Sequence, residues 1–265
     1  MAKRKKSVKK KKKSFLKKIF KTLGVTVLVL FLVSLLLPIA YRWINPPLTP
    51  LMVIRKIQDG SPIQKQWVDI ENISPHLIVC AMAAEDNNFL GHRGFDWGAI
   101  QKVIDLRKQG NKKRGGSSIS QQTAKNVFLW SGRSWVRKGL ESYFTVLIET
   151  FWSKKRIMEV YLNVIEMGKG IYGSEKAAEI YFHTTAKNLT LRQAALITAC
   201  YPDPRRRNPS TPTSYLNRQS DFISSMTKRF GKVSFDEENL QKARERFKKR
   251  ETTRRKKIDG NLLDL

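Results

Sequence analysis

Two adjacent carboxylates, Glu85 and Asp86, end the apolar run at residues 77–84 and offer this sequence's clearest acid–base chemistry. Burial raises the pKa of a carboxyl group, and a like-charged neighbour raises it further. A carboxyl group with a raised pKa can act as a general base or general acid. The simpler interpretation is a helix that reaches solvent at Glu85, with His92 and Arg93 as solvated loop residues. Taken by itself, this segment favours the simpler interpretation, because structural ion pairs also perturb pKa values.

A second segment, 114–126, begins with glycines and continues as a polar helix. Gly115 and Gly116 lack a Cβ, so the backbone there can approach a ligand closely. Ser117 or Ser118 can cap the following helix, whose N-terminal amides favour an anion. The alternative is an ordinary glycine turn.

The same helix carries polar side chains on one face. Gln121 and Lys125 are four residues apart and therefore share a face, and Arg133 follows shortly after the helix. These cations would suit a phosphate or pyrophosphate. A solvated lysine is the competing interpretation, and the segment alone does not decide between the two.

Two later helical segments add further charged residues. Arg137 and Glu141 have i,i+4 spacing, which is typical of a structural ion pair. Alternatively, Glu141 faces a cleft as a second carboxylate. In the segment 154–163 the apolar residues follow a core pattern, and Glu159 and Asn163 share a face.

The stretch 168–173 reads Gly-Lys-Gly-Ile-Tyr-Gly and matches a dinucleotide-binding pattern. It follows a helical pattern and not a strand, and no βαβ unit surrounds it. We therefore expect a flexible turn between helices here.

The elements that must position these residues are predicted to be helices. Apolar residues recur at helical spacing, and no alternating strand of useful length is evident. The expected helices are 75–84, 97–108, 118–130, 135–151, 154–166, 175–182 and 191–200, with 242–257 either an exposed helix or disordered. Cys80 and Cys200 lie in apolar surroundings, which favours buried free thiols, although spacing does not exclude a disulfide.

The N-terminus indicates a membrane anchor. The chain has 265 residues and a formal net charge of +29, and residues 2–21 contain no acid. Twenty uncharged, mostly apolar residues follow at 22–41, enough to cross a hydrocarbon core of about 30 Å as a helix. Because the lysines adjoin this span, anionic lipid is a nearer partner than nucleic acid, and we expect no nucleic-acid binding.

The segments that carry candidate catalytic and binding residues follow one another in a fixed order. This order resembles the motif signature of the peptidoglycan glycosyltransferases, the transglycosylases also found in bifunctional penicillin-binding proteins. The matching motifs are Glu85-Asp-x-x-Phe-x-x-His92-x-Gly, Gly115-Gly-Ser-x-Ile-x-Gln-Gln, Arg137-Lys-x-x-Glu141, Lys154-x-x-Ile-x-Glu-x-Tyr-Leu-Asn163 and a final segment from Ala194 to Pro209. The similarity covers about residues 67–209 and is closest to the monofunctional biosynthetic form.

This resemblance implies a mainly α fold, in which a lysozyme-like helical domain has a smaller membrane-associated lobe and follows one transmembrane helix. It implies polymerisation of lipid II into β-1,4-linked glycan strands, with undecaprenyl pyrophosphate released. Glu85 would be the general base, while Lys125 and Arg133 would hold the donor pyrophosphate. Glu141 would be the second carboxylate, assisting the donor site either directly or by orienting a cation. Residues expected to bind substrate or shape the site are Asp86, Phe89, His92, Gly94, Gly116, Ser117, Ser118, Gln121, Gln122, Arg137 and Lys138.

The resemblance also implies an organisation and a location. The expected segments are a cytoplasmic basic tail (1–21), a transmembrane signal anchor (22–43), a linker (44–66), the glycosyltransferase domain (67–215) and a basic C-terminal extension (216–265). The positive-inside rule places the N-terminus in the cytoplasm and the catalytic domain outside the inner membrane. The expected partners are lipid II, the growing glycan strand, membrane lipids and proteins of cell division or elongation.

Two further expectations concern metal ions and alternative functions. A divalent cation, Mg²⁺ or Mn²⁺, could accompany the pyrophosphate, although the sequence contains no dedicated ligand set. The alternative functions are a muramidase-like glycan hydrolase, which also uses two carboxylates, and a non-catalytic membrane-tethered protein that binds glycan or lipid.

Overall fold

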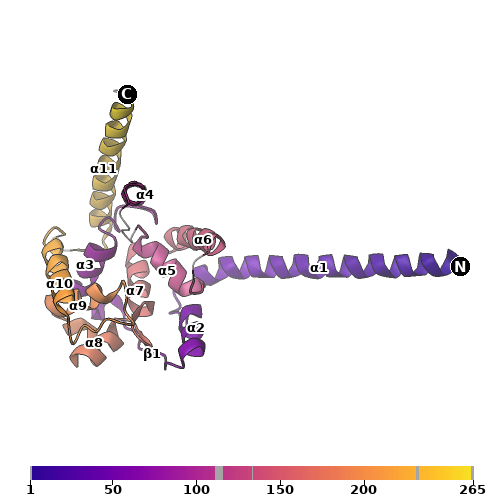
Figure 1. The fold of residues 1–265 in the computed structure, drawn as a ribbon, viewed down its shortest axis with the longest axis horizontal. Helices are drawn as coiled ribbons and strands as arrows, with labels where there is room; N and C mark the ends of the chain where they lie inside the picture. The colour runs from indigo at the N-terminus through magenta and orange to yellow at the C-terminus, as the bar shows by residue number, and fades with distance from the viewer. Residues whose placement is uncertain (1, 111–115, 133, 231–232, 264–265) are drawn as a thin grey trace. The chain divides into compact units, whose positions relative to one another are not determined.

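The computed structural model describes residues 2–110, 116–132, 134–230 and 233–263, with side chains for 17–106, 108–110, 116–132, 134–230 and 233–254. These residues are mainly helical, as predicted (Figure 1). Their α-helices are α1 (Ala2–Ala40), α2 (Pro50–Asp59), α3 (Pro75–Glu85), α4 (Trp97–Lys108), α5 (Ile119–Phe128), α6 (Trp135–Phe151), α7 (Lys154–Val164), α8 (Ser174–Phe182), α9 (Leu191–Cys200), α10 (Ser214–Thr227) and α11 (Glu237–Leu263). Two short 3-10 helices are η1 (Ile70–Asn72) and η2 (Ala186–Asn188).

The chain divides into two compact units, of which the first ends at Ile44 and consists mainly of α1. The 24-residue part Lys17–Ala40 is long and apolar enough to cross a membrane, by length and composition. Its apolar side chains, such as Phe20, Leu30 and Leu36, are exposed. A helix with apolar side chains all round fits a hydrocarbon environment, so α1 is consistent with a membrane anchor.

The second unit, Asn45–Leu265, holds the remaining helices. Helix α5 packs against α2, α6 and α7, while α3 packs against α9 and α10 (Figure 1). The apolar faces predicted from the sequence meet in this core, where Leu77, Ile119, Met158 and Leu162 are fully buried.

Hydroxyl side chains determine where most of these helices begin. A serine or threonine oxygen accepts a hydrogen bond from a backbone N–H in the first turn, which satisfies a donor that the helix leaves unpaired. These caps are Thr49, Ser74, Ser118, Ser134, Ser153, Thr190 and Thr213.

A small three-stranded sheet, which the sequence pattern did not predict, lies beside the helices. Its strands β1 (Gln64–Lys65), β2 (Glu166–Gly168) and β3 (Ile171–Tyr172) have the order β1-β3-β2. Strands β1 and β3 are parallel, whereas β2 and β3 are antiparallel. The stretch 168–173 is thus part of a β-hairpin and not a turn between helices, and the preceding helix ends at Val164 instead of 166.

The glycine at the tip of this hairpin explains its shape. Gly170 has a φ of 74°, and a Cβ there would lie 2.5 Å from the carbonyl oxygen of Pro62. The same residue's carbonyl accepts a hydrogen bond of 2.8 Å from the N–H of Gln64. The hairpin is therefore held by a segment that lies about a hundred residues earlier in the chain.

The C-terminal helix α11 packs on the loop that follows α3. The ring of Phe247 meets the ring of His92 edge-on at 5.9 Å, and Arg250 Nη1 donates a 2.8 Å hydrogen bond to Asn88 Oδ1. A Cβ on Gly91 would lie 2.7 Å from Phe247 Cβ, so the two segments are in close contact. The sequence had left this region open between an exposed helix and disorder.

The two cysteines are free and buried, which confirms the prediction of free thiols. Burial raises the pKa of Cys80 to about 12 and that of Cys200 to about 11. Both thiols are therefore protonated at neutral pH and chemically inert in the folded chain.

Candidate active site

Glu85 is the last residue of α3 and lies where this otherwise apolar helix emerges from the core. Its carboxyl group is partly buried and accepts a 2.7 Å hydrogen bond from Gln122 Nε2. Burial raises the pKa of Glu85, and the charge of Asp86 adds to the rise, whereas the Gln122 hydrogen bond and the charge of Lys125 oppose it. A carboxylate with these surroundings can accept a proton from a hydroxyl group.

The orientation of Gln122 is fixed from its other side. The hydroxyl of Tyr161 donates to Gln122 Oε1 at 3.4 Å, which leaves the amide nitrogen to face Glu85. Burial raises the pKa of Tyr161 well above its ordinary value, so this hydroxyl remains a donor. Tyr161 therefore supports Glu85 through one intervening side chain, a role that its place in a core-like helix did not indicate.

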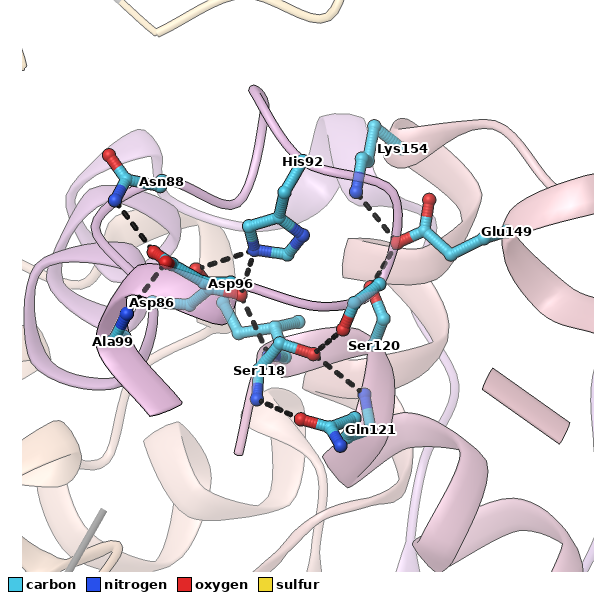
Figure 2. A network of polar contacts seen from close by, with 12 residues as sticks. Asp86, Asn88, His92, Asp96, Ala99, Ser118, Ser120, Gln121, Glu149 and Lys154 are labelled. Atoms are coloured by element: carbon cyan, nitrogen blue, oxygen red, sulfur yellow. Dashed lines mark hydrogen bonds and ion pairs between the residues drawn. The ribbon is translucent and has the colours of Figure 1, made fainter. Parts of the chain in front are cut away.

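Asp86 connects the end of α3 to the start of α5. Its buried carboxylate lies 2.9 Å from His92 Nε2 and accepts a 3.0 Å hydrogen bond from the backbone N–H of Ile119 (Figure 2). An acidic group at the first turn of a helix also compensates the helix dipole. These contacts hold Asp86 and His92 in place within the fold. This is consistent with the expectation that the two residues shape the site.

Three other residues predicted to shape the site lie around this connection. Phe89 is fully buried, and its ring lies 4.6 Å from the ammonium group of Lys154. Gly94 has a φ of 85°, and a Cβ there would lie 2.7 Å from Thr145 Cγ2. The carbonyl oxygen of Gly94 accepts a hydrogen bond of 2.5 Å from Ser118 Oγ.

The start of α5 is a capping box. Ser118 Oγ accepts from the N–H of Gln121 at 3.1 Å, and Gln121 Oε1 accepts from the N–H of Ser118 at 2.9 Å. Of the two serines proposed as caps, Ser118 therefore performs this role. Gly116, two residues earlier, has a φ of 106°, which favours glycine.

A second buried network lies beside the first and involves residues that the sequence did not single out. Ser120 donates to Glu149, and Glu149 Oε1 also accepts a 2.7 Å hydrogen bond from Lys154 Nζ (Figure 2). Side chains of Glu149 and Lys154 are 8% and 7% exposed, and burial lowers the pKa of Lys154. Together with Ser120, this buried pair connects α5, α6 and α7. In the sequence, only the position of Lys154 in a family motif pointed to it.

Lys125 lies on α5 one turn from Gln122, and both line a cavity of about 340 Å³. Burial lowers the pKa of Lys125, and the negative charges of Glu141 and Glu85 oppose this shift. The cavity lining also includes Arg137, so predicted cations from two helices meet at one cavity. Such a cavity favours an anionic ligand. Glu85 does not line it, but its hydrogen-bond partner Gln122 does.

Glu141 forms the ion pair that its spacing suggested. Glu141 is 3% exposed, and its carboxylate accepts hydrogen bonds from Arg137 Nη1 at 2.8 Å and from Lys138 Nζ. Lys138 Nζ also lies 3.5 Å from Ser117 Oγ. Because Arg137 lines the cavity, Glu141 orients a cation toward it.

Two charged residues of this cavity were missed by the sequence reasoning, namely Arg55 on α2 and Glu166 on β2. No local pattern links them, because they are far apart in the sequence. Conversely, two residues named in the sequence lie outside the described residues. They are Arg133, which was predicted to hold the pyrophosphate, and Gly115. Among the described residues, no group of three or more His, Cys, Asp or Glu is arranged to hold a metal ion.

Comparison with known proteins decides the family. A family model described as Transglycosylase matches residues 52–227, which is more than half of the chain. The chain belongs to the transglycosylase family. The matched span of this transglycosylase contains Glu85, Lys125 and Glu141 together with every residue that lines the cavity except Leu51.

Similar proteins carry the name "Biosynthetic peptidoglycan transglycosylase". The protein from Caulobacter vibrioides is 52% identical over 205 residues, which cover 76% of this transglycosylase and 89% of the relative. The one from Bacteroides thetaiotaomicron is 49% identical over 217 residues, or 80% and 88% of the two chains. The one from Shewanella oneidensis is 43% identical over 226 residues, or 84% and 97%.

Proposed function

We propose that this chain is a peptidoglycan glycosyltransferase that polymerises lipid II into β-1,4-linked glycan strands and releases undecaprenyl pyrophosphate. The observation that carries the proposal is that Glu85, a carboxylate of raised pKa, accepts a 2.7 Å hydrogen bond from Gln122, which lines a cavity together with Lys125 and Arg137. A proton acceptor next to a cationic cavity matches an acceptor hydroxyl that attacks a pyrophosphate-linked sugar. The family and the names of the similar proteins agree with this reaction.

In the proposed reaction the 4-hydroxyl oxygen of the acceptor sugar attacks the anomeric carbon of the donor. Glu85 takes the hydroxyl proton while the new C–O bond forms. The bond from the anomeric carbon to the pyrophosphate breaks on the opposite face, which inverts the α-linkage to a β-linkage. The pyrophosphate leaves with the bonding electrons, and Lys125, together with Arg133, stabilises its developing charge.

Glu141 takes an indirect part in this scheme. Its carboxylate is buried between Arg137 and Lys138, so its own charge is neutralised by two cations. It therefore acts by holding Arg137, which lines the cavity, at the donor site. This role is the second of the two that the family resemblance implied for it.

A divalent cation stays a prediction. Mg²⁺ is commonly bound through one or two carboxylates together with the phosphates of a substrate, and needs no complete protein cage. Any Mg²⁺ or Mn²⁺ in this site would thus be held largely by the donor pyrophosphate. No step above passes through the metal.

We also infer that α1 anchors the enzyme with its lysine-rich end in the cytoplasm. The basic residues precede the apolar part Lys17–Ala40, which supports this orientation through the positive-inside rule. Protease treatment of spheroplasts tests it. The second unit should be digested from outside, and protection of that unit would reverse the orientation.

The polymerisation assay uses the full chain in detergent with purified lipid II, and separately with finished glycan. Formation of glycan strands from lipid II is expected, with no cleavage of the finished polymer. Cleavage without polymerisation would favour a muramidase-like hydrolase. Absence of both reactions would favour a binding protein and would contradict the proposal.

A further inference from the structure

The cavity that Lys125 lines is also lined by two charged side chains that the proposed reaction does not use, Arg55 and Glu166, and these belong to a larger charged cluster. Arg55 Nε lies 3.6 Å from Glu166 Oε2, and Arg205 Nε lies 3.5 Å from Glu166 Oε1. Arg205 also pairs with Asp59, which is on the same helix as Arg55. The cluster therefore joins α2, β2 and the segment after α9.

The pairing within this cluster is incomplete. Arg55 Nε and Glu166 Oε1 are buried and have no hydrogen-bond partner. Separations of 3.5–3.6 Å are ion pairs but not good hydrogen bonds. Buried charges are normally both paired and hydrogen-bonded, because desolvation is otherwise costly. Glu166 therefore gives Arg55 no good hydrogen bond, and because Arg55 lines the cavity, an anion bound there could offer its guanidinium better acceptors.

The charge of the cavity indicates what that ligand is. Arg55, Lys125 and Arg137 line it, against the single carboxylate of Glu166. The Glu166 side chain is 9% exposed, and burial raises its pKa, whereas the charges of Arg55 and Arg205 oppose the rise. Lys125, Arg55 and Glu166 line the same cavity, so the cation predicted for the donor and this ion pair belong to one site.

We propose that Arg55 is a further cation for the pyrophosphate of the lipid-linked donor, and that Glu166 holds its guanidinium in the cavity until this anion replaces the carboxylate. Arginine suits this role because its fixed fork of N–H donors matches phosphate oxygens. Glu166 is then a positioning residue that competes with the anion. The inference rests on the proposed function, because it assigns the ligand of the same site.

The competing explanation is a purely structural ion pair that fastens α2 to the hairpin. The two explanations differ in the effect of removing Arg55. If Arg55 binds the pyrophosphate, its removal weakens binding about tenfold or more, and removal of the competing Glu166 charge tightens binding. If the pair only supports the fold, a folded variant without Arg55 binds pyrophosphate within about twofold of the wild type.

The test measures binding of inorganic pyrophosphate, and separately of farnesyl pyrophosphate, to the full chain by calorimetry. Arg55→Ala should weaken binding of both about tenfold or more, as expected for a lost charge-assisted hydrogen bond. Glu166→Gln should tighten binding of both several-fold. Lys56→Ala is the matched control, because Lys56 is the next residue on α2 but is exposed and does not line the cavity.

Three results would overturn the inference: no pyrophosphate binding by the wild type, binding by Arg55→Ala within twofold of the wild type, or weaker binding by Glu166→Gln. Thermal unfolding of each variant shows whether it is folded, and Arg55→Lys, which keeps the charge, should recover part of the affinity. Lipid II polymerisation by the wild type distinguishes a failure of the role of Arg55 from a failure of the proposed function. Polymerisation without the predicted binding pattern refutes the role of Arg55, whereas the pattern without polymerisation refutes the proposed function.

Discussion

Replacement of Glu85 by glutamine is the sharpest test of the proposed chemistry, because it removes the proton acceptor and retains the shape of the side chain. Gln122 Nε2 donates to Glu85 at 2.7 Å, and the oxygen of a glutamine amide at residue 85 can accept the same hydrogen bond. Loss of a general base typically slows a reaction about 10²–10⁴-fold. This corresponds to about 2.7–5.4 kcal/mol of transition-state stabilisation.

The pH dependence gives an independent reading of the same residue. The base must be ionised, so kcat/KM of the wild type should fall as the pH drops through the pKa of Glu85. Because burial raises this pKa, the fall should occur at a higher pH than for an ordinary glutamate. The residual activity of Glu85→Gln should lack this ionisation.

Stability should change in the opposite direction from activity. A raised pKa means that the folded state binds the Glu85 proton more tightly than the unfolded chain does. This contribution stabilises the fold at low pH and is lost as the pH rises through the folded-state pKa. At neutral pH the neutral amide avoids the cost of a partly buried charge, so Glu85→Gln should melt at the wild-type temperature or above it.

The assay follows polymerisation of labelled lipid II by the wild type, Glu85→Gln and the control Glu71→Gln. Glu71 carries an exposed carboxylate whose side chain is 62% accessible, and it is expected to retain the wild-type rate when replaced. A rate for Glu85→Gln within fivefold of the wild type would refute the role of base. So would an unchanged acidic limb in its pH profile.

Three further outcomes are expected. Lys125→Ala should lower kcat/KM for lipid II about 10–100-fold, because its contact with the pyrophosphate is lost. The value is obtained from initial rates measured at a series of lipid II concentrations, and wild-type rates would contradict this role. Asp86→Asn should lower the stability by about 1–3 kcal/mol, because the charge that accepts from the Ile119 N–H is lost, and an unchanged melting temperature would contradict the bridging role. Cys80 and Cys200 should resist a thiol reagent in the folded chain and react after unfolding, and rapid labelling of the native protein would conflict with their burial.

The helices could be predicted from the sequence to the extent that local patterns determine them. The bounds of α4, α6 and α9 agree with the predicted ranges, because their apolar periodicity and flanking caps or prolines are local signals. Helix α2 was missed because the surrounding prolines indicated a linker. The hairpin was missed because its strands, of two or three residues, are too short to show an alternating pattern. They are held in a sheet by pairing with β1, which is far away in the sequence.

The candidate site divides in the same way. The types and spacing of Glu85 and Lys125 made them candidates but did not decide their roles, and Gln122 was expected in the site only through the family resemblance. Spacing could not decide between an ion pair and a cleft-facing carboxylate for Glu141, because that depends on the burial produced by packing. The pair of Arg55 and Glu166 has no local pattern, and only the folded chain brings these residues together.

The contact between α11 and the loop after α3 bears on how this enzyme is divided into fragments. The region shared with the family ends at residue 227, yet Phe247 and Arg250 lie against Asn88, Gly91 and His92. In a fragment of residues 52–227, the side of the His92 ring that Phe247 covers would be exposed to water. This ring lies next to the carboxylate of Asp86, which binds the start of α5. A fragment meant to keep this contact must therefore extend beyond residue 227 and include at least Phe247 and Arg250.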